Sequence, residues 1–240
     1  MRRPTTRVLL ALGLTAAAPV ALSARDAALP AFAPIATQAA RVRPFVIALR
    51  RDTQTLARLS PAAEPGFSFV PTGREAERAG DGYNHIGDLH LRVRAPGGDC
   101  RDFSSAAARS PIRVLPAVGK VIAAADITAS MGQGAPFRVE RRWIDVAGRL
   151  ALRFRITNTG GAPLEIGALG LPMVFDNIIT DRELDQAHRE ASFADPYIGR
   201  DAGYLQVTRL NGHGPALLVL PERGTPLEAY TPLKNPSEES

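Results

Sequence analysis

A strict alternation of apolar and other residues between positions 150 and 156 limits the folds open to this chain more than any other feature. Leu150, Leu152, Phe154 and Ile156 fall on one face of an extended chain, and the residues between them fall on the other. This two-residue period predicts a half-buried β-strand and argues against a helix.

The segments on either side predict that this strand belongs to a meander. Residues 137–146 also alternate before becoming mostly apolar, and residues 147–149 have the length of a tight hairpin loop. Residues 158–163 carry the Gly and Pro needed for a second reversal before the apolar segment 164–177. We therefore expect three or four antiparallel strands with one apolar face, which a second layer must cover.

The rest of the chain resembles further strands of the same sandwich. Gly and Pro together number 41 of 240 residues (21 + 20) without a collagen period, which indicates many turns. Eleven to thirteen strand candidates are spaced as in an all-β protein. Beyond the meander they include residues 45–49, 53–56, 67–71, 83–95, 112–115, 118–125, 127–129, 204–210, 216–220 and 227–230. The predicted fold class is all-β, a large antiparallel β-sandwich.

Two charged stretches interrupt the strand pattern. Residues 181–195 carry a thin apolar stripe at helical spacing, so we expect a short helix or ordered loop that Thr180 or Asp181 caps and Pro196 ends. Residues 74–82 fit either one helical turn ending at Gly80 or a solvated excursion of the chain.

The N-terminus reads as a secretory signal peptide at residues 1–24. Three arginines precede an apolar run of about 15 residues, and small residues follow around Ser23 and Ala24 for cleavage. The alternative, a membrane anchor, needs roughly 20 apolar residues. We expect a secreted or periplasmic protein with no stable membrane span after cleavage, a loose lead-in at 25–43, one domain at 44–233 and a polar tail at 234–240.

Charge and cysteine content exclude several classes of function. Removing the predicted signal removes three arginines and no acid, so the formal charge falls from +5 to +2 (5 − 3). Without a basic run, this charge gives little support for nucleic-acid binding. The single cysteine, Cys100, permits no intrachain disulfide and no cysteine-based zinc site, so stability must come from a large apolar core.

Motifs that would carry chemistry are missing. The chain has no G-x-S-x-G, P-loop or H-E-x-x-H motif. His85 and His90 lie five residues apart on a predicted strand and therefore face opposite sides, which argues against a local metal pair. We expect no metal, no cofactor and ordinary hydrogen-bonded histidines.

The carboxylates near position 180 are the other candidates for chemistry. Asp176 ends a predicted strand, and Asp181, Glu183 and Asp185 follow closely. Paired carboxylates are typical of sugar hydrolysis, but acidic residues at 181–185 also suit a helix N-terminus. Trp143 could stack on a sugar ring if exposed, although a lone Trp in an apolar run is more often core. An aromatic content of 6% is low for an aromatic-lined carbohydrate-binding module.

Several sequence blocks resemble the N-terminal region of a secreted family known only as a domain of unknown function. These blocks are residues 64–71, 79–89, 101–109, 165–177 and 195–210, the last two being the most specific. Members look like six-hairpin glycosidases, in which a β-supersandwich of the galactose-mutarotase type leads into an α/α toroid. The resemblance implies a carbohydrate partner and a helical toroid domain that these 240 residues do not contain.

The resemblance carries over no catalytic residue, because the acid and base of similar enzymes lie mostly on the toroid. The expected function is that of a non-catalytic sandwich whose loops shape a sugar cleft. Candidate substrate-binding residues are Tyr83, His85, Asp88, Asp176, Asn177, Asp181 and Arg182. The alternatives are a free-standing carbohydrate- or protein-binding module and an inert truncated fragment.

Overall fold

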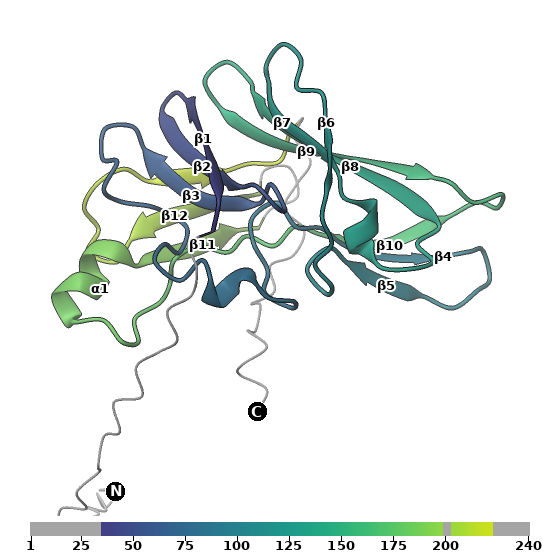
Figure 1. Ribbon diagram of the computed structural model, residues 1–240. Helices are drawn as coiled ribbons and strands as arrows, with labels where there is room; N and C mark the ends of the chain where they lie inside the picture. Colours follow the sequence, from purple (N-terminus) through teal and green to yellow (C-terminus); the bar gives the residue numbers. More distant parts are fainter. Residues whose placement is uncertain (1–34, 199–202, 223–240) are drawn as a thin grey trace, which may run out of the picture. The chain divides into compact units, whose positions relative to one another are not determined.

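The computed structural model describes residues 35–198 and 203–222, and these form an all-β structure (Figure 1). The described part contains thirteen strands, one α-helix and two 3-10 turns. The elements are β1 (Thr37–Val42), β2 (Phe45–Arg50), β3 (Leu56–Pro61), η1 (Glu77–Ala79), β4 (His90–Arg94), β5 (Arg101–Ser104), β6 (Arg113–Leu115), β7 (Val121–Asp126), η2 (Thr128–Met131), β8 (Phe137–Asp145), β9 (Leu150–Asn158), β10 (Glu165–Gly170), α1 (Leu184–Glu190), β11 (Ser192–Tyr197), β12 (Tyr204–Arg209) and β13 (Leu217–Val219).

The strands form four antiparallel sheets. Three sheets have three strands each, in the orders β1-β2-β3, β10-β4-β5 and β11-β12-β13, and one has four strands in the order β6-β7-β8-β9. Every pair of neighbouring strands in these sheets is antiparallel. The predicted fold class, an all-β antiparallel sandwich, is confirmed.

The central hairpin β8–β9 forms as the alternation predicts. The two strands pair without a register shift from Phe137 opposite Asn158 to Asp145 opposite Leu150. Its turn holds Ala147 at φ 52° and Gly148 at φ 79°, the left-handed conformations that a two-residue hairpin turn requires. The predicted continuation of the meander is wrong, however, because β10 leaves β9 and pairs with β4.

Two apolar cores lie between the sheets. The first core joins β2 and β3 to β12 and β13, and Trp143 of β8 is among its buried residues. The second core joins β4 and β5 to β7 and β8, with Leu89, Leu91, Val93, Phe103, Ala125, Ile127, Met131, Phe137 and Val139 buried in it. Trp143 is 2% exposed, so it is a core residue and not a stacking platform for a sugar.

Some sequence expectations need correction. The loose lead-in predicted at 25–43 is wrong from Thr37 onward, because residues 37–42 form β1 and pair with β2. The apolar stretch 127–129 lies partly in the 3-10 turn η2 and not in a strand. Within the charged excursion 74–82, a 3-10 turn forms and Arg78 is buried.

The predicted helix near 181–195 is shorter than expected. It begins after Glu183, so neither Thr180 nor Asp181 caps it, and it ends at Glu190. Residues Ser192–Tyr197 form β11, which runs through Pro196 because pairing with β12 outweighs the helical spacing of the local sequence.

Several expectations lie outside the described residues: the signal peptide at 1–24, the strand candidate at 227–230 and the polar tail at 234–240. Among the described elements, no helix is both long and apolar enough to cross a membrane.

Candidate functional site

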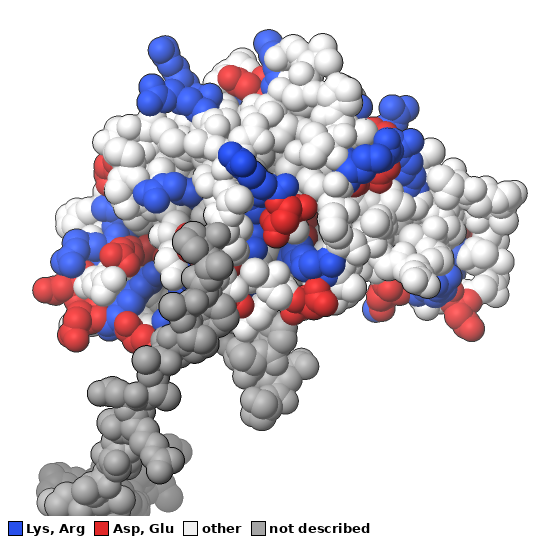
Figure 2. Space-filling view, in the orientation of Figure 1, with Lys and Arg blue, Asp and Glu red and all other residues white. Residues whose placement is uncertain are grey.

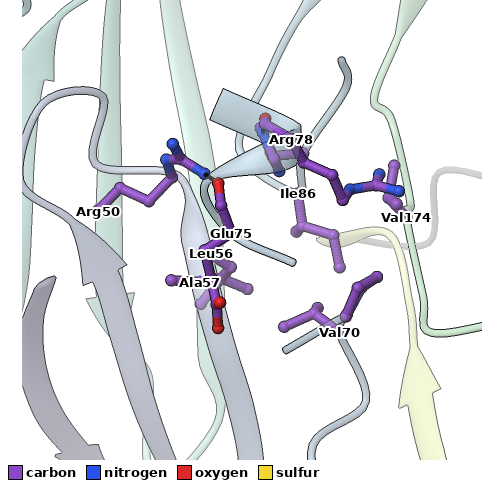
Figure 3. A pocket seen from close by; sticks show the side chains of 10 residues that line it. Arg50, Leu56, Ala57, Val70, Glu75, Arg78, Ile86 and Val174 are labelled. Atoms are coloured by element: carbon purple, nitrogen blue, oxygen red, sulfur yellow. Dashed lines mark hydrogen bonds between the residues drawn. The ribbon is translucent and has the colours of Figure 1, made fainter. Parts of the chain in front are cut away.

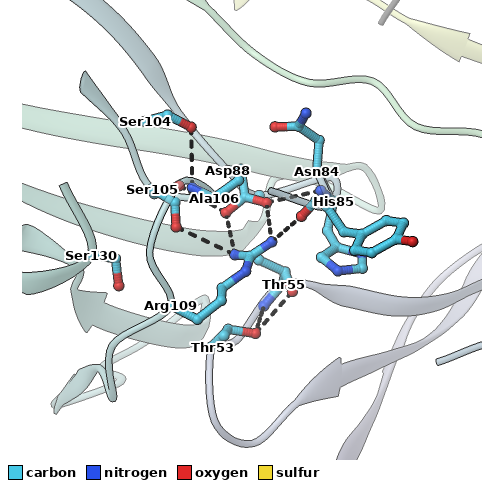
Figure 4. Close-up of polar contacts among 12 residues, drawn as sticks. Thr53, Thr55, Asn84, His85, Asp88, Ser104, Ser105, Ala106, Arg109 and Ser130 are labelled. Atoms are coloured by element: carbon cyan, nitrogen blue, oxygen red, sulfur yellow. Dashed lines mark hydrogen bonds and ion pairs between the residues drawn. The ribbon is translucent and has the colours of Figure 1, made fainter. Parts of the chain in front are cut away.

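Asp88, one of the predicted site residues, is the acceptor at the centre of a buried polar network (Figure 4). Its carboxylate accepts hydrogen bonds from both terminal nitrogens of Arg109, at 2.7 and 2.9 Å. The Ser105 hydroxyl donates to it at 2.7 Å and the His85 amide at 2.8 Å. Burial by itself would raise the pKa of Asp88, but the Arg109 guanidinium and the other donors lower it below its usual value.

His85 lies beside this network as a neutral imidazole. Its Nε2 is 2.8 Å from the carbonyl oxygen of Arg78. A carbonyl oxygen only accepts, so Nε2 carries the proton and donates. Burial, followed by the positive charge of Arg109, lowers the pKa of His85 from 6.5 to about 4. At neutral pH the ring is therefore uncharged, and at 8% exposure it is closed to a bulky substrate.

Arg141 ties the Asp88 loop to the central hairpin. The guanidinium donates to the carbonyl oxygen of Gly87 at 2.6 Å and to that of Thr53. Trp143 adds a hydrogen bond from its indole nitrogen to the carbonyl oxygen of Gln54 at 2.8 Å. Burial lowers the pKa of Arg141 to about 10, so it remains a cation at neutral pH. These contacts fix the loops before β3 and β4 against β8.

Arg109 and Arg141 are not among the site residues predicted from the sequence. Arg141 does leave a signal, because it falls in phase with the buried Phe137 and Val139 of the same strand. An arginine at a core position predicts a buried partner for its charge. Arg109 leaves no comparable periodic signal.

Asp176 forms a second buried ion pair. It is 3% exposed, and its two carboxylate oxygens lie 3.1 and 2.9 Å from the terminal nitrogens of Arg182. Arg182 also donates to the carbonyl oxygen of Ile178 at 2.7 Å, which closes the loop on itself. Asn177 is exposed, and its backbone amide donates to the carbonyl oxygen of Phe175 at 3.0 Å.

Asp181 is separate from Asp176 despite its closeness in sequence. It has φ 59°, and its side chain is 78% exposed beside Arg74, at 3.2 Å. The two carboxylates that the sequence places close together thus lie in different surroundings, one buried and paired, the other at the surface. Paired carboxylates of a glycosidase would both face one sugar ring.

The loops carrying these residues approach one another around Arg78, whose carbonyl oxygen accepts from His85. A cavity beside Arg78 is also lined by Arg50, His85 and Val174 (Figure 3). Its volume of about 10 Å³ is enough for about one water molecule and far too small for a sugar ring. The buried Nε of Arg50 has no hydrogen-bond partner and lies 3.6 Å from the Asp52 carboxylate.

Tyr83 contributes mainly through its backbone. Its carbonyl oxygen accepts a hydrogen bond from Arg109, while the ring lies 5.7 Å from the guanidinium carbon of Arg78. The structure thus joins Tyr83, His85 and Asp88 in one network and Asp176 with Arg182 in another. Whether any of the seven predicted residues contacts a sugar stays a prediction. In the described part of the chain, no three His, Cys, Asp or Glu residues gather as metal ligands.

Comparison with protein families assigns the chain to a family. Residues 48–240 match a family of unknown function, DUF5695. The chain belongs to this family. That confirms the resemblance to a family of unknown function, whereas the relationship to six-hairpin glycosidases stays a prediction. No curated protein matches the DUF5695 chain.

A solved structure of a polysaccharide lyase, BACCELL_00875, is similar in fold to the DUF5695 chain. The match has a TM-score of 0.56 and 17% sequence identity, and it covers 73% of this chain. It covers only 24% of the lyase chain, so the DUF5695 chain spans about a quarter of that protein. At this identity the likeness concerns the fold alone.

Proposed function

We propose that this chain is the β-sandwich part of an exported carbohydrate-active protein, in which it packs on a helical domain and shapes one wall of a carbohydrate site. In this proposal the sandwich supplies no catalytic acid or base. The observation that carries the proposal is an uncovered strip of apolar residues on the edge strand β10.

The strip continues the second core beyond its edge. Ile166 lies opposite Val93 and Leu169 opposite Leu91 in the β10–β4 pair. Directly opposed residues of antiparallel strands point to the same face, so both β10 residues point to the core side of the sheet. Yet Ile166 is 50% exposed and Leu169 53%, while their partners are 1% and 2% exposed.

A bulge is responsible for this arrangement. Positions 166 and 169 are three apart and would face opposite sides of a regular strand. The register shifts between Ile166 and Ala168, which restores both apolar side chains to one face. The residues between them, Gly167 and Ala168, are small and also exposed. β10 therefore presents an apolar surface with small side chains between the two larger ones. In the described part of the chain, this strand has a neighbour on one side only.

An exposed edge strand with an apolar face favours association with further polypeptide. A helix can pack closely against such a surface, because its side-chain ridges can lie across the small residues. The fold neighbour supports the carbohydrate part of the proposal, since it is a polysaccharide lyase of which this chain matches 24%. The predicted signal peptide supports export.

The buried ion pairs support the non-catalytic part. Asp88 and Asp176 are the two site carboxylates that are almost wholly buried, and each is held by an arginine. A general acid needs to reach its substrate within hydrogen-bond distance. Both carboxylates instead use their acceptor capacity inside the protein, which suits positioning of loops.

A second candidate function, a free-standing carbohydrate-binding module, is favoured by the outer face of the β11–β12 pair. Tyr197 stacks on Tyr204 there, with ring centroids 4.6 Å apart and planes 14° apart. Phe193 is 54% exposed on the same face, since it lies an even number of residues from Tyr197. Exposed aromatic rings on a flat sheet suit stacking on sugar rings.

The experiment is to incubate the purified chain with a panel of plant, bacterial and animal polysaccharides and to measure new reducing ends and unsaturated products. The proposal predicts no cleavage above a heat-denatured control. Cleavage by the purified chain above that control would overturn the non-catalytic role. Tight glycan binding lost in Tyr197→Ala and Phe193→Ala would favour the module.

A further inference from the structure

Three hairpin and loop ends surround a second depression, far larger than the one beside Arg78. Its volume is about 420 Å³, within the range of roughly 300–1,000 Å³ typical of small-ligand sites. The residues lining it come from the β1–β2 hairpin, the loop before β7 and the β8–β9 hairpin, and they are Arg41, Gly119, Lys120, Val121, Ile122, Asp145, Ala147 and Gly148.

The depression carries two positively charged side chains that can bind an anion. Arg41 and Lys120 are exposed, and neither forms an ion pair with any residue in the described part of the chain. Asp145 is the acidic residue of the lining, and one of its oxygens already accepts from the Gly148 amide at 2.9 Å. In contrast, the exposed Arg92 is paired with Asp102 at 2.7 Å. In Figure 2, basic side chains project at the upper edge of the view, above the hairpin ends seen there in Figure 1.

The walls of the depression are held in place. The Asp145 amide donates to the carbonyl oxygen of Lys120 at 2.9 Å, which joins two of the three walls. The β1–β2 hairpin, which forms the third wall, lies close to the β8–β9 hairpin. A Cβ atom added at Gly148 would be only 3.2 Å from the carbonyl oxygen of Arg43. Ala147 adopts φ 52°, a conformation that residues other than glycine rarely take.

The same lining offers apolar contact. Val121 and Ile122 are half-buried at the depression, and Ile122 packs against the first core. A sugar ring presents both hydroxyl groups and apolar C–H faces, so one ring can contact these side chains while its hydroxyls donate to the second oxygen of Asp145. A carboxylate or sulfate on the ring would meet Arg41 and Lys120.

We propose that this depression binds an acidic saccharide, with Arg41 and Lys120 holding the anionic substituent and Val121 and Ile122 contacting the ring. The saccharide part of this inference rests on the proposed function, whereas the preference for an anion rests on the two unpaired cations.

The test uses isothermal titration of the purified chain with three hexasaccharides: oligogalacturonate, which carries carboxylates, chondroitin sulfate, which carries carboxylates and sulfates, and neutral cellohexaose. The altered protein is Arg41→Gln/Lys120→Gln. The matched control is Arg155→Gln/Arg189→Gln, which removes two exposed, unpaired charges elsewhere in the described residues. Circular dichroism checks that all three proteins are folded.

We expect at least one acidic hexasaccharide to bind the unaltered chain, with an affinity that falls as salt rises. The affinity should fall at least 10-fold in Arg41→Gln/Lys120→Gln and less than 2-fold in the control. Binding of oligogalacturonate would identify a carboxylate as sufficient, and binding of chondroitin sulfate alone would identify sulfate as required.

Equal weakening in both altered proteins would overturn the site, because it would reveal unspecific attraction. Binding of cellohexaose but of neither acidic hexasaccharide would overturn the site and leave the proposed function standing. Binding of none of the three would also overturn the site, while the proposed function would still be decided by the cleavage assay.

Discussion

Ile166 lies directly opposite Val93 across the β10–β4 pair, yet Ile166 is 50% exposed and Val93 1%. Two side chains on the same face of one sheet thus have very different access to solvent. The apolar layer of the second core extends onto β10, and nothing in the described part of the chain covers it there. This relationship is the basis of the proposal that the sandwich packs on a further domain.

Charges placed on β10 should be tolerated by the isolated chain. Ile166→Lys/Leu169→Lys should change the free energy of unfolding by less than about 1 kcal/mol, because both side chains are already half exposed. Binding of the dye ANS, which reports exposed apolar surface, should fall. In contrast, Leu91→Ala, the buried partner of Leu169, should cost about 2–5 kcal/mol. A loss of several kcal/mol in the double-lysine protein would show that β10 is covered.

The Asp88–Arg109 pair should be essential for stability. Asp88→Asn removes the charge that compensates the Arg109 guanidinium, whose side chain is 12% exposed. Breaking such a pair costs about 3–5 kcal/mol, measured as the free energy of unfolding in urea. The control is Asp102→Asn, which breaks the exposed pair with Arg92 and should leave the free energy of unfolding almost unchanged. Equal effects of the two substitutions would contradict the buried network.

The two carboxylates of the loop after β10 should behave differently. Asp176→Asn leaves Arg182, whose side chain is 9% exposed, with only the half-exposed Glu190 at 3.5 Å as a charged partner, so we expect a loss of about 3 kcal/mol in stability. Asp181→Asn should change stability by less than about 1 kcal/mol, because that side chain is 78% exposed. Thermal unfolding of both proteins decides the matter. An Asp176→Asn protein as stable as the unaltered chain would show that the fold does not require this ion pair, which would favour a catalytic role for Asp176.

Stability should fall with acid between pH 6.5 and 4 because of His85. The folded protein holds the pKa of His85 at about 4, against 6.5 for an ordinary histidine. Between these values the unfolded chain binds more protons, so the free energy of unfolding is highest above pH 6.5 and falls toward pH 4. The contribution is on the order of 3 kcal/mol.

Urea unfolding of the unaltered protein and of His85→Gln over this pH range measures the effect. Subtracting the two curves removes the contribution of His90, whose pKa burial also lowers. Asp88 titrates below its ordinary 3.8 and therefore lies outside this window. A difference between the two proteins that does not change with pH would contradict a neutral, buried His85.

The sequence predicts the local elements of this fold better than their pairing. The alternation at 150–156 is enough to predict β9, and the short loop at 147–149 predicts its hairpin with β8. The pairing of β10 with β4 joins residues about 70 positions apart, and no local pattern encodes that choice. The same limit explains β11, whose helical spacing is overruled by nonlocal pairing with β12.

In the candidate site, too, single residues could be predicted from the sequence but their partners could not. Asp176 is a candidate in the sequence because it ends a predicted strand, and His85 and Asp88 are candidates because they lie in a block that resembles the family. Their partners Arg109 and Arg182 decide that the carboxylates are buried and neutralised, and that follows only from the folded arrangement. Arg141 is the exception, since its place in the alternation of β8 already marks it as buried.

Site-specific photo-crosslinking from β10 tests directly whether a helical domain covers this strand. A photoreactive benzoylphenylalanine replaces Leu169 in the protein as the source organism produces it, and a second protein carries it at Val118, which is 74% exposed on a loop far from β10 in sequence. We expect position 169, and not position 118, to crosslink to a helical polypeptide with carbohydrate-degrading activity, in the same chain or a separate one. Crosslinks from neither position, or equally from both, would contradict this expectation.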